Sequence, residues 1–291
     1  MKRYGICILA VFAAMTAWAG EPIDQSIEAE EGATILVENV AGLVRITGWD
    51  RPEVKVTGEL GDGADRVVVS AEYGRVLVRV LMPRSSTTAD TELIVNAPAS
   101  SPLVVETVSA DIEVSAMNGS QRLKTVSGNV TTFTAGDDLE VKSAAGDITI
   151  NGDGTTSDAT IASVSGDVLI DGVTGEVNAK SVSGDVLLQG TGITQARLSS
   201  TSGDLRLAGS VNSDPQLVLE SISGDTTIEI DGDLSGEFDL KTTSGEIKTC
   251  FGLEPDRDEY GAGQSLRHTE DEGEAQVRVK TMSGDISICR N

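Results

Sequence analysis

Histidine, cysteine and aromatic residues are scarce in this chain. The 291 residues include one histidine and three cysteines, and aromatic residues make up 3% of the sequence. A zinc site built from several histidine or cysteine ligands is therefore excluded by number. A Ser-His-Asp triad would have to use His268, which lies in a polar, acidic stretch. We therefore expect no catalytic residues, no cofactor and no metal site.

Basic residues are also few. The chain has 22 Lys and Arg against 46 Asp and Glu, a net charge of −24. Nucleic-acid binding needs a basic patch that neutralises phosphates, so we expect no nucleic-acid partner. The same charge disfavours an anionic membrane surface. High acidity by itself is consistent with the solubility of an exported protein.

The N-terminus has the pattern of an export signal. Lys2 and Arg3 precede an apolar stretch over residues 6–15, and Ala17-Trp18-Ala19 supplies a small-x-small cleavage site. The apolar stretch is too short for a stable membrane span, so we expect no retained transmembrane helix. Residues 1–19 are predicted to be a signal peptide, which places the mature protein in the periplasm or on the cell surface.

One phrase, apolar-Ser-Gly-Asp-apolar, recurs nine times. Residues 164–168 and 182–186 carry the strict form Val-Ser-Gly-Asp-Val. The acidic position of each repeat defines what we call the corner column: Asp111, Asn129, Asp147, Asp167, Asp185, Asp204, Asp225, Glu246 and Asp285. Most intervals are 18 to 21 residues and the last is 39. A fixed period of about twenty residues is typical of a solenoid, in which each repeat packs on its neighbours.

Each repeat predicts two short strands. The residues one and three places after the corner column alternate as buried positions would, as in Val168 and Ile170, and so do those eight and six places before it, as in Val177 and Ala179. The expected fold is all-β: a parallel β-solenoid, or β-helix, with about two strands per rung. A hydroxyl column four places before the corner column should point inward and find hydrogen-bond partners there: Thr107, Thr125, Ser143, Ser163, Ser181, Ser200, Ser221, Thr242 and Thr281.

The register also divides the chain. Residues 20–100 are less regular and are predicted to be an N-terminal cap with degenerate rungs, because a solenoid needs an atypical end. Residues 101–291 form the repeat region, with an acidic insertion at 251–275 that reads as a projecting loop. Cys250 and Cys289 both fall four residues after their corner position. Neighbouring rungs would place their Cα atoms ~4.8 Å apart, so we predict a disulfide between them.

Two stretches resemble a known family. Residues 38–50 (ENVAGLVRITGWD), followed by 53–56 (EVKV), are similar to the start of the bacterial "putative adhesin" domain family, and residues 98–109 (PASSPLVVETVS) continue the likeness into the repeats. The resemblance covers roughly residues 33–290. It implies the repetitive all-β architecture and an adhesin-like role, and it carries over no functional residue. The insertion at 251–275 departs from the family pattern.

Three readings of the repeat surface remain open. The corner column could bind calcium between rungs, or each Asp could cap its own turn, which needs no cation. A basic column five places before the corner, which we call the lysine column, could meet an anionic partner or be a solvated face: Lys124, Lys142, Lys180, Lys241 and Lys280. A carboxylate pair in a groove could hydrolyse glycosides, although Trp49 is the sole tryptophan after signal removal.

The reading favoured by the sequence is a non-catalytic, exported, envelope-associated structural or adhesin-like binding module. Its partner would be an envelope protein or a polysaccharide. A carbohydrate-active enzyme and a calcium-loaded scaffold are the alternatives. Because the chain stops two residues after Cys289, end-to-end self-association is a further hypothesis.

Overall fold

The protein is an all-β molecule in which most strands pair in parallel. The computed structural model describes residues 21–83, 90–155, 158–232, 234–257, 263–270 and 273–290. Every regular element among them is a strand, and all of them join one 22-stranded sheet. The all-β prediction is thereby confirmed. None of the described segments is a helix that could cross a membrane. The predicted signal peptide, residues 1–19, lies outside the described residues.

The strand bounds follow the repeat. In chain order they are β1 (Glu21–Glu28), β2 (Thr34–Trp49), β3 (Glu53–Leu60), β4 (Arg66–Glu72), β5 (Arg75–Leu81), β6 (Asp90–Pro98), β7 (Leu103–Ser115), β8 (Gln121–Ser127), β9 (Val130–Thr134), β10 (Leu139–Ala145), β11 (Ile148–Gly152), β12 (Ala159–Ser165), β13 (Val168–Lys180), β14 (Val186–Ser202), β15 (Leu205–Ser223), β16 (Thr226–Ile230), β17 (Gly236–Ser244), β18 (Ile247–Thr249), β19 (Asp256–Arg257), β20 (Gln264–Thr269), β21 (Ala275–Ser283) and β22 (Ile286–Arg290).

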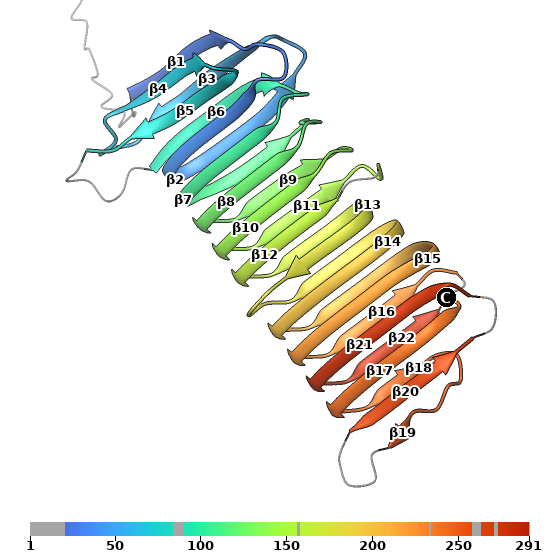
Figure 1. Ribbon diagram of the computed structural model, residues 1–291. Helices are drawn as coiled ribbons and strands as arrows, with labels where there is room; N and C mark the ends of the chain where they lie inside the picture. Colours follow the sequence, from blue (N-terminus) through green and yellow to red (C-terminus); the bar gives the residue numbers. More distant parts are fainter. Residues whose placement is uncertain are drawn as a thin grey trace, which may run out of the picture.

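Two parallel ladders run the length of the molecule (Figure 1). The first contains β8, β10 and β12, with the later halves of β13, β14 and β15 continuing it. The second contains β9 and β11, with the early halves of β13, β14 and β15, followed by β16. Each repeat contributes one segment to each ladder, and we call that unit a rung.

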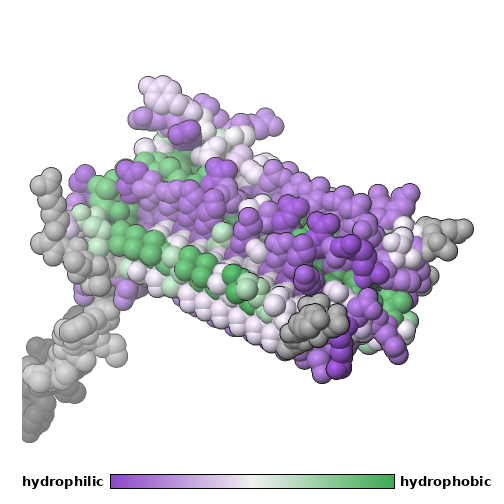
Figure 2. Space-filling model, turned by 60° about the horizontal axis from the view of Figure 1, so that its bottom comes forward, coloured by the Kyte–Doolittle hydropathy of each residue, from purple (hydrophilic) through white to green (hydrophobic). Residues whose placement is uncertain are grey.

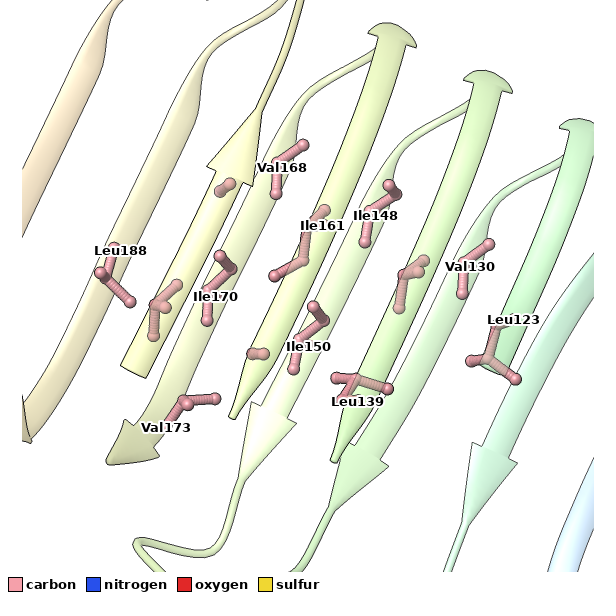
Figure 3. Packing of buried hydrophobic residues seen from close by; sticks show 14 of the residues in the cluster. Leu123, Val130, Leu139, Ile148, Ile150, Ile161, Val168, Ile170, Val173 and Leu188 are labelled. Atoms are coloured by element: carbon pink, nitrogen blue, oxygen red, sulfur yellow. The ribbon is translucent and has the colours of Figure 1, made fainter. Parts of the chain in front are cut away.

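The core lies between the two ladders (Figure 3). Ile150 and Ile170 come from neighbouring rungs of the second ladder, and Ile161 comes from the first; all three are at most 1% exposed. Most of their partners along each ladder are Val, Leu or Ile, and the exceptions are Thr132 and Ala179. Period-two alternation therefore places one face of the rung strands in the core, as the sequence pattern predicts.

The hydroxyl column is buried, but most of it lacks the expected hydrogen bonds. Thr107 and Thr242 each donate to a backbone carbonyl, that of Ala110 at 3.1 Å and that of Gly284 at 2.9 Å. Six members have no partner for the side-chain oxygen: Thr125, Ser143, Ser163, Ser181, Ser200 and Ser221. The prediction that none would stay unpaired is wrong for these six. Rungs spaced ~4.8 Å apart hold successive hydroxyls beyond mutual hydrogen-bond distance.

The last repeat in the chain is not the last rung in space. Strand β21 pairs with β15 on one side and β17 on the other, and β22 lies in the same way between β16 and β18. After β16 the chain thus forms the outermost rung, β17 and β18, first. It then returns, and β21 and β22 form the rung between β15/β16 and β17/β18. Cys250 and Cys289 form a disulfide across these two rungs, with Cα atoms 4.8 Å apart.

Part of the insertion forms a strand rather than a projecting loop. Strand β20 pairs antiparallel with β17, so that Leu266 lies opposite Leu240, and two residues of β19 pair with β20 in turn. Gln264 and Leu266 are buried, at 8% and 5% exposure. Their period-two spacing is hidden in the sequence by the polar residues around them. Strand β20 therefore covers the β17 part of the outer rung, whereas β18 is paired only with β22 among the described strands. End-to-end self-association stays a prediction.

The opposite end is also built from antiparallel pairs. Strand β1 pairs with β3, β3 with β6, and β4 with β5. Strand β2 connects this region to the stack, because its register with β7 aligns Gly42 with Ala110 and Leu43 with Asp111. Residues 41–43 thus occupy the place of a Ser-Gly-Asp corner in a rung that has lost the acidic residue.

Candidate functional site

The corner column forms a hydrogen-bond ladder between rungs. The backbone N–H of Asp167 donates to Asp147 Oδ1 at 2.9 Å, and that of Asp185 donates to Asp167 Oδ1 at the same distance. Equivalent bonds join every neighbouring pair from Asp111 to Glu246, with Asp285 preceding Glu246 in space. Each carboxylate thus caps the next rung. The prediction that each Asp caps its own turn is wrong.

This ladder explains which side chains the column tolerates. Asn129 keeps an acceptor oxygen in the same position and bonds Asp147 N–H at 3.0 Å. Glu246, the one longer acid, belongs to the outermost rung, which has no further corner to cap. The column therefore requires a short side chain whose oxygen can accept a hydrogen bond from the backbone N–H of the next rung.

The column does not gather carboxylates into a recognisable cation site. Each acidic or amide oxygen named above accepts from a backbone N–H, which occupies one oxygen without a cation. Among the residues that the structure describes, no three His, Cys, Asp or Glu side chains lie close enough to hold a metal ion. Calcium binding stays an alternative to be tested in solution.

The lysine column lies on the outer face of the first ladder. Register pairs Lys124 with Lys142 and Lys280 with Lys241 on adjacent strands. Lys124 contacts Glu106 at 3.3 Å, and Lys142 contacts Glu140 at 2.5 Å. The column is solvent-accessible and partly neutralised by acids on the same face.

A groove crosses this outer face near the N-terminal end of the stack. It has a volume of about 790 Å³, within the range of ligand sites. Leu36 and Val104 contribute half-buried apolar surface, whereas Arg75, Arg122 and Glu140 contribute charge. Five strands line it, β2, β5, β7, β8 and β10, together with the start of β12. An elongated ligand lying across the strands would meet apolar, basic, acidic and hydroxyl groups in turn, because one register position holds Leu36, Val104, Arg122, Glu140 and Thr160 on successive strands.

One carboxylate of the groove, Glu140, is poorly suited to be the general acid of glycoside hydrolysis. Hydrogen bonds from the side chains of Lys142 and Arg122 lower the pKa of Glu140 to about 2. A general acid needs a raised pKa so that it holds a proton near neutral pH. Glu140 is therefore a structural anion. Asp138 and Asp158 also line the groove, without an aromatic residue among its lining residues.

Tyr73 extends the groove and was not singled out by the sequence. It occupies the turn between β4 and β5 with a φ of 53°, and it is 99% exposed. Arg75 and Leu36 line both the groove and an adjoining hollow of about 400 Å³ that Tyr73 also lines. A positive φ costs a bulky residue of the order of 1–3 kcal/mol. The sequence feature that could have identified Tyr73 is the Tyr-Gly pair at a two-residue hairpin turn, where Asn-Gly is usual.

The other residues considered from the sequence lie apart from this groove. His268 lies on β20 opposite Phe238, at the other end of the stack. Trp49 donates its indole N–H to the Glu53 carbonyl at 2.9 Å, and the Arg51 guanidinium lies 5.0 Å from its ring. The structure brings neither of them together with the groove carboxylates.

Three comparisons place the chain among known proteins. The family model described as Toastrack DUF4097 matches residues 68–289. No curated protein matches the sequence. The chain is also similar to three solved structures, none of which superposes closely enough to place individual residues.

The first is a "putative cell adhesion protein" from Clostridium sporogenes, at 11% identity and a TM-score of 0.25, covering 93% of this chain and 100% of that chain. The second is a "putative adhesin" from Bacteroides fragilis, at 11% identity and 0.40, covering 92% and 97%. The third is a "putative lipid binding protein" from Parabacteroides distasonis, at 14% and 0.40, covering 94% and 97%.

Proposed function

The chain belongs to the Toastrack DUF4097 family, and we propose that it is an exported, envelope-associated β-solenoid that acts as a non-catalytic structural or adhesin-like binding module. The two parallel ladders, in which every rung repeats the register of its neighbours, support the solenoid reading. Export rests on the signal pattern of residues 1–19.

The observation that carries the binding role is the groove on the outer face of the first ladder. Its wall combines Arg75 and Arg122 with the apolar surface of Leu36, and Tyr73 stands exposed at its extension. Concave surface with a few convergent polar groups is what ligand sites share. The ligand that fits an open groove across repeated rungs is itself elongated. We take it to be an envelope polysaccharide or an extended segment of an envelope protein.

Binding of the mature chain, residues 20–291, to the envelope fraction of the source cell tests this function. We expect binding by the unaltered chain and at least a tenfold loss for the double variant Tyr73→Ala and Arg75→Ala. Arg206→Ala on the second ladder is the matched control, because it removes one exposed guanidinium far from the groove. Protease treatment of the fraction separates a polysaccharide ligand, which survives, from a protein ligand.

Two results would contradict the proposal. One is equal binding by the groove variant and the Arg206 control, which would place recognition elsewhere. The other is turnover of envelope polysaccharide by the mature chain, measured as release of reducing ends. That result would favour the carbohydrate-active alternative over a binding module.

A further inference from the structure

A row of exposed apolar side chains follows one long edge of the molecule. We call it the apolar ridge: Val108, Val126, Val164, Val182, Ile222 and Met282. Their exposures lie between 47% and 59%. Figure 2 shows a line of hydrophobic surface running along the stack, with purple, hydrophilic surface above it and pale surface below it. An isolated exposed valine needs no explanation, but a continuous row over successive rungs marks an interaction surface.

The ridge is continuous because its members share one register position, three residues before the corner column. Val164 and Val182 flank the bridge partners Ser165 and Ser183 on adjacent rungs. The positions without a large apolar residue hold small or short side chains, namely Ala144, Thr201 and Thr243. No bulky or charged side chain interrupts the row.

Opposite charges border the ridge on its two sides. The lysine column lies two residues before it along each strand, and the corner column lies three residues after it. Lys142 and Asp147 are both exposed, as are Lys180 and Asp185. A partner that covers the ridge must therefore meet cations on one side and carboxylates on the other.

We propose that the apolar ridge is a self-association surface, on which a second copy of this chain packs ridge to ridge with the two long axes parallel. A two-fold axis along the ridge turns the lysine column of one copy towards the corner column of the other. The same rung then faces itself, so that Lys180 meets the partner's Asp185 and Lys280 meets the partner's Asp285. An isologous interface requires this kind of self-complementary patch.

The antiparallel alternative lacks this complementarity. A two-fold axis across the ridge would turn lysines towards lysines and carboxylates towards carboxylates, which costs free energy at close range. In the parallel arrangement two rungs place an acid in the lysine position, Glu106 and Glu220. Glu106 is neutralised within its own chain by Lys124 at 3.3 Å. Charge pairing therefore selects the parallel orientation.

The contact is of the size that a reversible dimer needs. Nine rungs spaced ~4.8 Å apart extend over about 38 Å, and the five residue steps from the lysine column to the corner column span about 17 Å of chain. The strip therefore offers about 650 Å² per copy, within the lower part of the range for specific interfaces. The net charge of −24 on each copy opposes association, so we expect the dimer to weaken at low salt. This inference goes beyond the proposed function, because it does not involve the groove.

Sedimentation and single-cysteine crosslinking of the mature chain test the orientation. Both natural cysteines of the described chain are joined in a disulfide, so Val108→Cys or Met282→Cys adds one free thiol near either end of the ridge. Under mild oxidation, each variant alone should yield a covalent dimer. An antiparallel dimer would crosslink only when the two variants are mixed, and that result would overturn the proposal.

Two further variants test the surface itself. We expect Val182→Asp to raise the dimer dissociation constant at least tenfold, whereas Leu169→Asp on the second ladder, also exposed at 38%, should leave it unchanged. Lys180→Glu should raise it more than Lys55→Glu on β3, which changes the net charge equally. A monomer at every concentration up to 100 µM and at 0.15 M salt would overturn the inference, and so would equal effects of a ridge variant and its control.

Discussion

The glycine of each corner faces the backbone of the previous rung. Gly184 has a φ of +135°, and a Cβ added there would lie 2.2 Å from the carbonyl oxygen of Gly166. The same approach recurs at Gly203, which faces Gly184 at 2.2 Å. Two constraints therefore coincide at this position, a left-handed backbone and no room for a side chain. Either one alone would favour glycine.

This arrangement makes Gly184→Ala a severe substitution. We expect a loss of about 2–4 kcal/mol in the free energy of unfolding, because the backbones of two rungs must separate. Gly154→Ala is the matched control, since Gly154 has a φ of +82° with nothing within 4 Å of the added Cβ. Its cost should be about 1–2 kcal/mol, from backbone strain alone. Urea unfolding followed by circular dichroism measures both, and equal losses would contradict the close-approach argument.

The corner carboxylates act as acceptors rather than as charges. Asp167→Ala removes the acceptor for the Asp185 N–H, so we expect a loss of about 1–2 kcal/mol. Asp167→Asn should cost less than about 0.5 kcal/mol, because an amide oxygen fills the same place at Asn129. Glu246→Ala, in the outermost rung, should also be nearly neutral. If the Asn variant were as unstable as the Ala variant, the negative charge of Asp167, rather than its hydrogen-bond acceptor, would be what stabilises neighbouring rungs.

At the scale of the element, the strands were predictable and their order was not. Alternation of apolar residues located both segments of each rung, because a buried face has period two in any strand. Every rung carries the same columns, however, so the sequence does not say which rung lies beside which. Only Glu246 gives a hint, since a longer acid fits where no further corner follows.

The groove and the ridge illustrate the same limit. The ridge residues were visible as a column, but a valine near a strand end is ordinary until its exposure is known. The groove depends on β2 lying between β5 and β7, a pairing of segments far apart in the sequence. Local patterns do not contain that information.

The disulfide is a link between the rung that returns and the rung it covers. Reducing the Cys250–Cys289 bond frees a loop of 39 residues, worth up to ~4 kcal/mol in the chain-entropy model. We expect reduction to accelerate amide hydrogen exchange in β17, β18, β21 and β22, and to leave β8 to β12 unchanged, because each rung contacts only its neighbours. Uniform acceleration along the stack would contradict this local effect.

At the scale of the whole molecule, the C-terminal rung, β21 and β22, lies between two rungs that carry the same columns of residues. Strands β16 and β18 are both partners of β22, in register through Thr227, Ser287 and Lys248. Without residues 273–291, β17 and β18 would expose the edge that β21 and β22 now cover. The Asp225 carboxylate would also lose the Asp285 N–H that it accepts from.

We therefore expect a chain ending at residue 272, with Cys250→Ser, to close the gap by one rung spacing. The buried and corner columns of β17 and β18 match those of β15 and β16, and Asp225 would then accept from Glu246 N–H.

The pair Thr227→Cys and Lys248→Cys reports this movement. In the full-length chain, with Cys250 and Cys289 as Ser, the two positions lie two rungs apart, ~9.6 Å, which is beyond the Cα separation of a disulfide. In the shortened chain they would be neighbours at ~4.8 Å and should crosslink under the same oxidation. A crosslink in the full-length chain would contradict the placement of β22 between β16 and β18. Absence of a crosslink in the shortened chain would mean that the outer rung unfolds once its neighbour is removed.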